Sequence, residues 1–178
     1  MPQGFFSERR ITMESRSKIF GHPAHTILIV FPLGLLSTAV IFDTLHLLTK
    51  KPKLGEQGLA MTGAGILGGL AAAPFGAWDW LFIPKGTRAR DVGRVHGLGN
   101  VAVLGLFGWS WALREAAPPK PGGLPFLLSL LGFGLAGVTG WLGGEMVDRL
   151  GVGVDDGANV DAPSSLSGRP ADASGEAA

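Results

Sequence analysis

The stretch IFGHPAHTILIVFPLGLLSTAVIF, residues 19–42, decides the fold of this chain. It holds 24 residues without an Asp, Glu, Lys or Arg, and it lies between Lys18 and Asp43. The apolar core of a bilayer is about 30 Å thick, and a helix needs about 20 residues to cross it. A helix also satisfies its backbone hydrogen bonds internally, which lipid requires. The stretch therefore predicts a membrane-spanning helix over about residues 24–48.

Three further uncharged stretches of similar length follow along the chain. They hold 22, 19 and 24 residues and cover residues 57–78, 95–113 and 121–144. Tryptophans occur near their ends, where an indole prefers the membrane interface. The predicted spans are about residues 58–82, 93–113 and 123–145. The expected fold is an all-α, integral membrane four-helix bundle over residues 19–150.

Both ends of the chain differ in composition from this bundle. Residues 1–18 are polar and basic and have no apolar run, so a cleaved signal peptide is not expected. From residue 151 to residue 178 the chain is rich in Asp, Ser, Pro, Gly and Ala. Such a tail has too little apolar surface to pack, and we expect it to be disordered.

The composition of the chain excludes several kinds of site and gives no support to others. Charged residues make up 16% of the chain, against about 25% in soluble proteins. The net charge of +1 gives no reason to expect a nucleic-acid partner. Cysteine is absent, which excludes disulfides, thiolate-bound clusters and covalent c-type haem attachment. No nucleophile–base pair or hydrolase motif is found, so nothing in the sequence indicates an enzyme.

The basic residues near the spans predict the orientation in the membrane. Nine Lys and Arg residues lie on the side of the N-terminus and five on the opposite side. Because the more basic side usually faces the cytoplasm, both termini are expected there. The nine are Arg9, Arg10, Arg16, Lys18, Lys85, Arg88, Arg90, Arg94 and Arg149, and the five are Lys50, Lys51, Lys53, Arg114 and Lys120.

Two glycine motifs resemble a dinucleotide-binding fingerprint. Residues 63–68 and 132–137 both match GxGxxG. Neither follows a strand or opens a βαβ unit, as that fingerprint requires. Inside apolar spans, small residues three or four positions apart let helix backbones approach closely. We therefore expect a packing role for such pairs, namely Gly65 with Gly69, Ala72 with Gly76, and Gly140 with Gly144.

Polar residues are expected to gather at one membrane face. Spans one and three begin on the side of the N-terminus, and spans two and four end there. Ionisable groups at such a face often belong to functional sites. The alternative is that the acids sit in the headgroup region, where Asp79 or Glu145 pairs with a nearby arginine. The residues predicted at this face are His22, His25, Asp79, Arg88, Arg90, Arg94, His96, Asn100, Glu145, Asp148 and Arg149.

The histidines carry the most specific prediction. Pro23 suits the start of a helix, which makes His22 a cap and places His25 in the first turn. His22 and His25 at this helix end, together with His96, could hold a metal or the iron of a haem b, for which His25 and His96 are the expected ligands. Arg88, Arg90 or Arg94 could then bind the propionates. His46 lies about 30 Å further along the helix, so at most one bis-histidine haem is expected. The alternative is that these histidines are hydrogen-bonding structural groups.

Asp43 lies near the opposite end of the first span. It could belong to a proton relay. A second interpretation has it reaching the membrane surface or bonding to a neighbouring helix, with His46 available three positions later.

Four motifs in order give the chain a family resemblance. They are residues 21–32 (GHPAHTILIVFP), 78–90 (WDWLFIPKGTRAR), 96–100 (HGLGN) and 140–149 (GWLGGEMVDR) followed by residues 151–154 (GVGV). From about Gly21 to Val154 the chain resembles the bacterial membrane family called domain of unknown function 2231. The resemblance implies four transmembrane helices in the bacterial plasma membrane. In outline the family is also similar to two-haem b-type cytochrome membrane domains.

The chain departs from that family at two places. Some relatives carry histidine in place of Val30, and many carry Tyr-Arg-His at residues 148–150 (DRL here). If either histidine bound iron, this chain would lack that ligand, whereas His25 and His96 are present.

Three functions are compatible with the sequence. The first is an accessory subunit of a larger membrane complex, which contacts lipid, other subunits or a second copy through its glycine-rich faces. The second is a haem- or metal-binding electron-transfer protein that uses His25 and His96. The third, a small transporter, has little support because no inverted repeat and no charged midplane site is evident.

Overall fold

The first helix of the bundle is interrupted once, near its start. In the computed structural model, which describes residues 12–115 and 121–173, α1 (Ala24–Leu28) is followed by α2 (Val30–Thr49). Ile29 between them keeps a helical backbone, with φ −65° and ψ −17°. Pro32 has no N–H to donate one turn back, which explains the interruption. The two helices therefore act as one span, which ends at Lys50 in the left-handed conformation (φ 59°).

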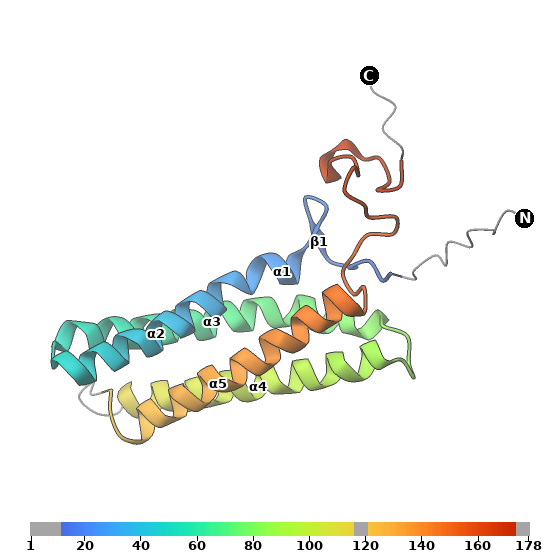
Figure 1. The fold of residues 1–178 in the computed structure, drawn as a ribbon. Helices are drawn as coiled ribbons and strands as arrows, with labels where there is room; N and C mark the ends of the chain where they lie inside the picture. The colour runs from blue at the N-terminus through green and yellow to red at the C-terminus, as the bar shows by residue number, and fades with distance from the viewer. Residues whose placement is uncertain (1–11, 116–120, 174–178) are drawn as a thin grey trace, which may run out of the picture.

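Three long helices complete the bundle. They are α3 (Pro52–Phe82), α4 (Arg88–Glu115) and α5 (Leu124–Gly144), and a π-helical turn, η1 (Glu145–Arg149), continues α5. Figure 1 shows the helices side by side along one common direction. The predicted all-α four-helix fold is confirmed. The helices α3 and α4 begin about six residues before the predicted spans, because charged residues extend both helices beyond the apolar segments.

Three of the helical segments are long and apolar enough to cross a membrane, namely Ala24–Thr49, Pro52–Phe82 and Leu124–Arg149. The helix α4 has a similar length but carries charged residues in its first two turns and at its end. Its uncharged middle, residues 95–113, lies in the bundle beside the other helices (Figure 1). The chain is thus a helical membrane protein. Arg9, Arg10 and Lys120, which count toward the predicted orientation, lie outside the described residues.

A small apolar core fills the middle of the bundle. Leu36 and Val40 of α2 pack with Val103 and Phe107 of α4, and Ile66, Leu135 and Ala136 close the cluster from α3 and α5. The side chain of Leu36 lies on Gly65, and that of Phe107 lies on Gly132. Gly69 is covered by Leu104. The packing role predicted for glycines in these helices is therefore confirmed at these positions.

One predicted glycine pair does not pack inside the chain. At Gly140, nothing within the described residues lies within 4 Å of where a Cβ would be, and at Gly144 only Asp148 of the same helix does. The prediction for this pair was wrong for contacts within the bundle, because this side of α5 faces outward.

A short hairpin and an irregular tail lie beyond one end of the bundle. The strands β1 (Lys18–Ile19) and β2 (His22–Pro23) pair antiparallel around Phe20 and Gly21, both with positive φ. The tail has little regular structure, namely the 3-10 turn η2 (Ser165–Ser167) and a bridge between Met13 and Val152. The described part of the tail runs against the N-terminal segment and the hairpin (Figure 1), a contact that the expectation of disorder did not include.

Candidate functional site

Two imidazoles meet at the end of the bundle where the N-terminal segment lies. His25 in α1 and His96 in α4 have ring centroids 6.3 Å apart, with the edge of one ring toward the face of the other (83°). Both side chains are half-buried. The topology argument predicted both residues at the same membrane face, and the structure places their rings beside each other there.

Each imidazole is anchored to a backbone carbonyl of the helix beside it. His25 Nδ1 lies 3.0 Å from the Ala72 oxygen, and His96 Nδ1 lies 2.8 Å from the Thr139 oxygen. A carbonyl can only accept, so Nδ1 carries a proton in both rings, and in the neutral form of each imidazole Nε2 is the atom with the lone pair. Neutral imidazoles held in this way are the usual form of metal-ligating histidine.

Glycines provide the room for the two rings. A Cβ at Gly76 would lie 2.8 Å from His25 Cε1, and a Cβ at Gly143 would lie 3.2 Å from His96 Cε1. Each glycine follows the anchoring carbonyl by one helical turn. A side chain at either position would push the ring away from its carbonyl.

An amide and a hydroxyl distinguish His96 from His25. Asn100 Nδ2 donates to His96 Nε2 at 3.2 Å and to the His96 carbonyl at 2.9 Å. Thr139 donates its hydroxyl to Asn100 Oδ1 at 3.1 Å, which keeps the amide nitrogen directed toward the imidazole. His96 therefore has both ring nitrogens occupied.

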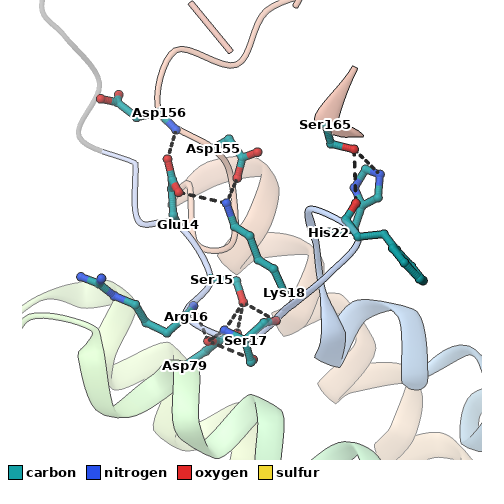
Figure 2. Close-up of polar contacts among 11 residues, drawn as sticks. Glu14, Ser15, Arg16, Ser17, Lys18, His22, Asp79, Asp155, Asp156 and Ser165 are labelled. Carbon is teal, nitrogen blue, oxygen red and sulfur yellow. Dashed lines mark hydrogen bonds and ion pairs between the residues drawn. The ribbon is translucent and has the colours of Figure 1, made fainter. Parts of the chain in front are cut away.

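The third histidine predicted at this face is separate from the pair. His22 lies in β2, is exposed, and its Nε2 is 3.4 Å from Ser165 Oγ of the tail (Figure 2). The helix is capped by Pro23, and His22 makes no capping hydrogen bond. The prediction of His22 as the helix cap was wrong, because Pro23 precedes the helix instead of opening it.

The three arginines have partners other than a cofactor. Arg88 donates to Glu145 at 2.6 Å, which confirms an expected ion pair. Arg90 donates to the Trp80 and Ile83 carbonyls, and its guanidinium stacks over the Trp80 ring at 3.8 Å from the centroid. Arg94 is largely exposed, 3.4 Å from Asp91.

Asp79 fixes the N-terminal segment to the end of α3. Its carboxylate accepts from Ser15 Oγ at 2.6 Å, from the Arg16 backbone N–H at 2.8 Å, and from both the backbone and side chain of Ser17 (Figure 2). The expected arginine partner was wrong for Asp79, because backbone and hydroxyl donors of residues 15–17 occupy its oxygens.

A charged cluster joins the tail to the same segment (Figure 2). Lys18 donates to Glu14 at 2.9 Å and to Asp155 at 2.6 Å, and the Asp156 backbone N–H donates to Glu14. The hydrogen bond from Lys18, with that of Asp156, lowers the pKa of Glu14. The hydrogen bond to Asp155 raises the pKa of Lys18. Both shifts favour the charged forms, which hold the tail in place.

The remaining polar residues of this face lie further out. Asp148 and Arg149, both exposed, belong to η1 and line an open hollow of about 290 Å³ together with Trp141, Gly144 and Glu145. Neither of them is a hydrogen-bond partner of the histidine pair. The predicted gathering at one face thus separates into the imidazole pair, the Asp79 contacts and this hollow.

The opposite end of the bundle holds a buried ion pair. Arg114 donates to both carboxylate oxygens of Asp43, at 2.8 and 2.9 Å, and also to the Gly55 carbonyl. The exposed fractions are 2% for Arg114 and 0% for Asp43. His46 is bonded to the Lys51 carbonyl instead. The expected bond from Asp43 to a neighbouring helix is confirmed, whereas its pairing with His46 was wrong, because the His46 ring turns toward the loop.

One known protein family matches most of this chain. The model of one family, predicted membrane proteins with the domain of unknown function 2231, matches residues 21–156. The chain belongs to this family. The matched residues include the four spans of the bundle, both histidines of the pair and the buried ion pair. Comparison with curated proteins and with solved structures gave no match.

Proposed function

We propose that the protein holds one haem-type cofactor between His25 and His96 and carries electrons in the bacterial plasma membrane. The observation that supports this is the convergence of two imidazoles whose Nδ1 atoms are fixed on carbonyls. Their Nε2 lone pairs are the donors that haem iron takes from histidine. In this proposal both termini face the cytoplasm.

The donor set favours a macrocycle over a free ion. Among the described residues, no group of three His, Cys, Asp or Glu side chains could hold a metal ion. Two imidazoles alone leave a bare ion short of protein ligands, since structural metal sites commonly use four. A porphyrin brings four nitrogens of its own, so that His25 and His96 would suffice as the ligands from the protein. The cofactor would supply a one-electron redox centre.

In this proposal, residues around the two histidines would hold and orient them for the cofactor. Ala72 and Thr139 fix the tautomers, and Gly76 and Gly143 leave room for the rings. Asn100 has to release His96 Nε2. Of the three arginines considered for propionates, Arg94 is held least, because Arg88 and Arg90 are engaged.

A haem titration of the purified protein in detergent tests the proposal. We expect an absorption band that shifts on dithionite reduction, and its loss in His25→Ala and in His96→Ala. The matched control is His46→Ala, because His46 also bonds to a carbonyl through Nδ1 but has no imidazole beside it. A protein that stays colourless, or a band that survives in both His25→Ala and His96→Ala, would contradict the proposal.

A second candidate is an accessory role in a larger membrane complex. It is favoured by glycines of α4 and α5 with nothing within 4 Å in the described chain, namely Gly97, Gly105, Gly108, Gly134, Gly137 and Gly140. Bare glycine faces let another membrane helix approach closely. Substitution of Gly134 and Gly137 by leucine should then remove a partner that co-purifies in mild detergent. An identical set of co-purifying proteins would count against it.

A further inference from the structure

The bundle is built from two helical hairpins that repeat each other. The first hairpin consists of α1, α2 and α3, and the second consists of α4 and α5. Asp43 and Arg114 are 71 positions apart, and the same interval separates His25 from His96 and Leu36 from Phe107. The two histidines meet, the two charged residues form an ion pair, and Leu36 and Phe107 belong to the same core cluster. The helices α2 and α4 therefore run parallel and in register.

The second helices of the two hairpins, α3 and α5, also repeat each other. Equivalent residues in them are separated by slightly fewer positions than equivalent residues in α2 and α4. This second interval separates Gly65 from Gly132, Ala72 from Thr139 and Gly76 from Gly143. Equivalent positions make equivalent contacts. A large apolar side chain covers Gly65 and Gly132 alike. An imidazole bonds to the Ala72 and to the Thr139 carbonyl, and the same two rings lie on Gly76 and Gly143.

This arrangement brings equivalent residues face to face at three levels along the bundle. Two of the three levels do not distinguish the hairpins. At the first level, His25 lies beside another histidine, His96, and at the second, Leu36 shares the apolar core cluster with Phe107, another large apolar residue. At those levels, two copies of the same hairpin would match about as well as the two different ones.

The third level differs in the sign of the charge. Asp43 of the first hairpin meets Arg114 of the second, fully buried and through two hydrogen bonds. Two first hairpins would bring two Asp43 carboxylates together, and two second hairpins would bring two Arg114 side chains together. A buried charge without its counter-ion is strongly unfavourable. Opposite charges at matched positions are a common device for rejecting wrong partners.

We infer that the Asp43–Arg114 pair is a pairing code that joins a first hairpin only to a second hairpin. The complementary hairpin can come from the same chain or from a second copy. Membrane insertion places all copies in one orientation, so the second case keeps the helices parallel. Residues 83–87 form the link that would exchange a hairpin between copies.

Full-length charge variants test this inference. Asp43→Arg alone places two arginines opposite each other within one chain, and Arg114→Asp alone places two aspartates there. Each single variant should lose monomer yield in detergent by about tenfold or more. The double variant, Asp43→Arg with Arg114→Asp, restores opposite charges and should recover most of the yield.

Co-expression of the two single variants with different tags provides the sharper experiment. Exchange of hairpins between the two chains makes both contacts complementary. One contact then joins the two substituted side chains, and the other joins the unchanged Asp43 and Arg114. We expect a heterodimer carrying both tags. When either variant is expressed alone, we expect no dimer, because exchange between its copies pairs like charges. The proposal is overturned if the double variant is no better than the singles and co-expression gives no heterodimer, or if either single variant behaves like the wild type.

Discussion

A carboxylate oxygen of Asp43 lies so close to the backbone of Gly58 that a Cβ there would overlap it. Because Gly58 has no side chain, the backbone of α3 lies directly against the Asp43 carboxylate. Asp43 Oδ1 can therefore accept the hydrogen bond from Arg114. Gly58 is itself buried. This contact makes the ion pair dependent on a residue that carries no charge.

Substitution of Gly58 by alanine should therefore destabilise the protein. The added methyl group forces Asp43 or α3 to move, and overpacking of this kind costs about 1–3 kcal/mol. Thermal unfolding in detergent, followed by circular dichroism, measures the loss. Gly34→Ala is the matched control, because nothing in the described chain lies within 4 Å of a Cβ there. It should be neutral or up to about 1 kcal/mol more stable; an equal loss in both variants would refute the explanation.

Asp79→Asn should release the N-terminal segment from α3. Asp79 accepts hydrogen bonds from three consecutive residues, and bonds to a charged group contribute about 1.5–3 kcal/mol each. Hydrogen exchange of the Arg16 and Ser17 amides should accelerate by about tenfold or more. Asp91→Asn serves as control, because Asp91 is exposed and its ion pair with Arg94, at 3.4 Å, is long and exposed to solvent. Unchanged protection in Asp79→Asn would show that other contacts hold the segment.

The contact between the tail and the N-terminal segment should depend on pH. The pKa of Glu14 is lowered by Lys18 and Asp156, so its contribution is complete above the ordinary range of a carboxyl and is lost as pH falls through the lowered value. The pKa of Lys18 is raised by Asp155, so its contribution is complete below the ordinary lysine value and is lost as pH rises through the raised one.

Spin labels at the exposed positions Phe20 and Leu166 can follow this change. The distance between the labels should be short and narrowly distributed at intermediate pH, and broad at both extremes. Lys18→Met should broaden it at every pH. A distribution in the wild type that does not change between acid and alkaline solution would exclude the charged cluster as the cause.

The four helices, and the placement of both histidines at one face, could be predicted because they depend on the length of the spans and on their alternating direction. Uncharged stretches of 19 to 24 residues leave few alternatives to a spanning helix. Alternating spans then put His25 and His96 at the same face. Their separation of 6.3 Å, by contrast, depends on Gly76 and Gly143, which the sequence alone does not assign to a ring.

The ion pair was missed although its elements were visible. Arg114 counted only as a basic residue flanking a span, and the expected bond from Asp43 to a neighbouring helix named no partner residue there. Both residues stand near the far ends of parallel spans, which was the available indication. Arg90 was considered for a cofactor because the sequence does not show that its guanidinium lies on the Trp80 ring at the end of the preceding helix.

Replacement of Asn100 by leucine should leave His96 anchored but free its second nitrogen. The amide donates to His96 Nε2 at 3.2 Å, while Nδ1 depends on the Thr139 carbonyl at 2.8 Å. We expect the protein to lose about 0.5–1.5 kcal/mol, as for one neutral hydrogen bond. Nitrogen NMR of labelled histidines should show the His96 Nε2 signal moving toward that of an acceptor without a donor.

The same spectra contain their own control. The Nδ1 proton of His96 and both signals of His25 should stay in place, because Asn100 makes no hydrogen bond with His25. The variant should also bind haem more tightly, since Nε2 no longer has to be released, by up to about tenfold for one hydrogen bond. A change of the His96 tautomer in Asn100→Leu would contradict the argument, because it would mean that the amide, and not the Thr139 carbonyl, decides which nitrogen carries the proton.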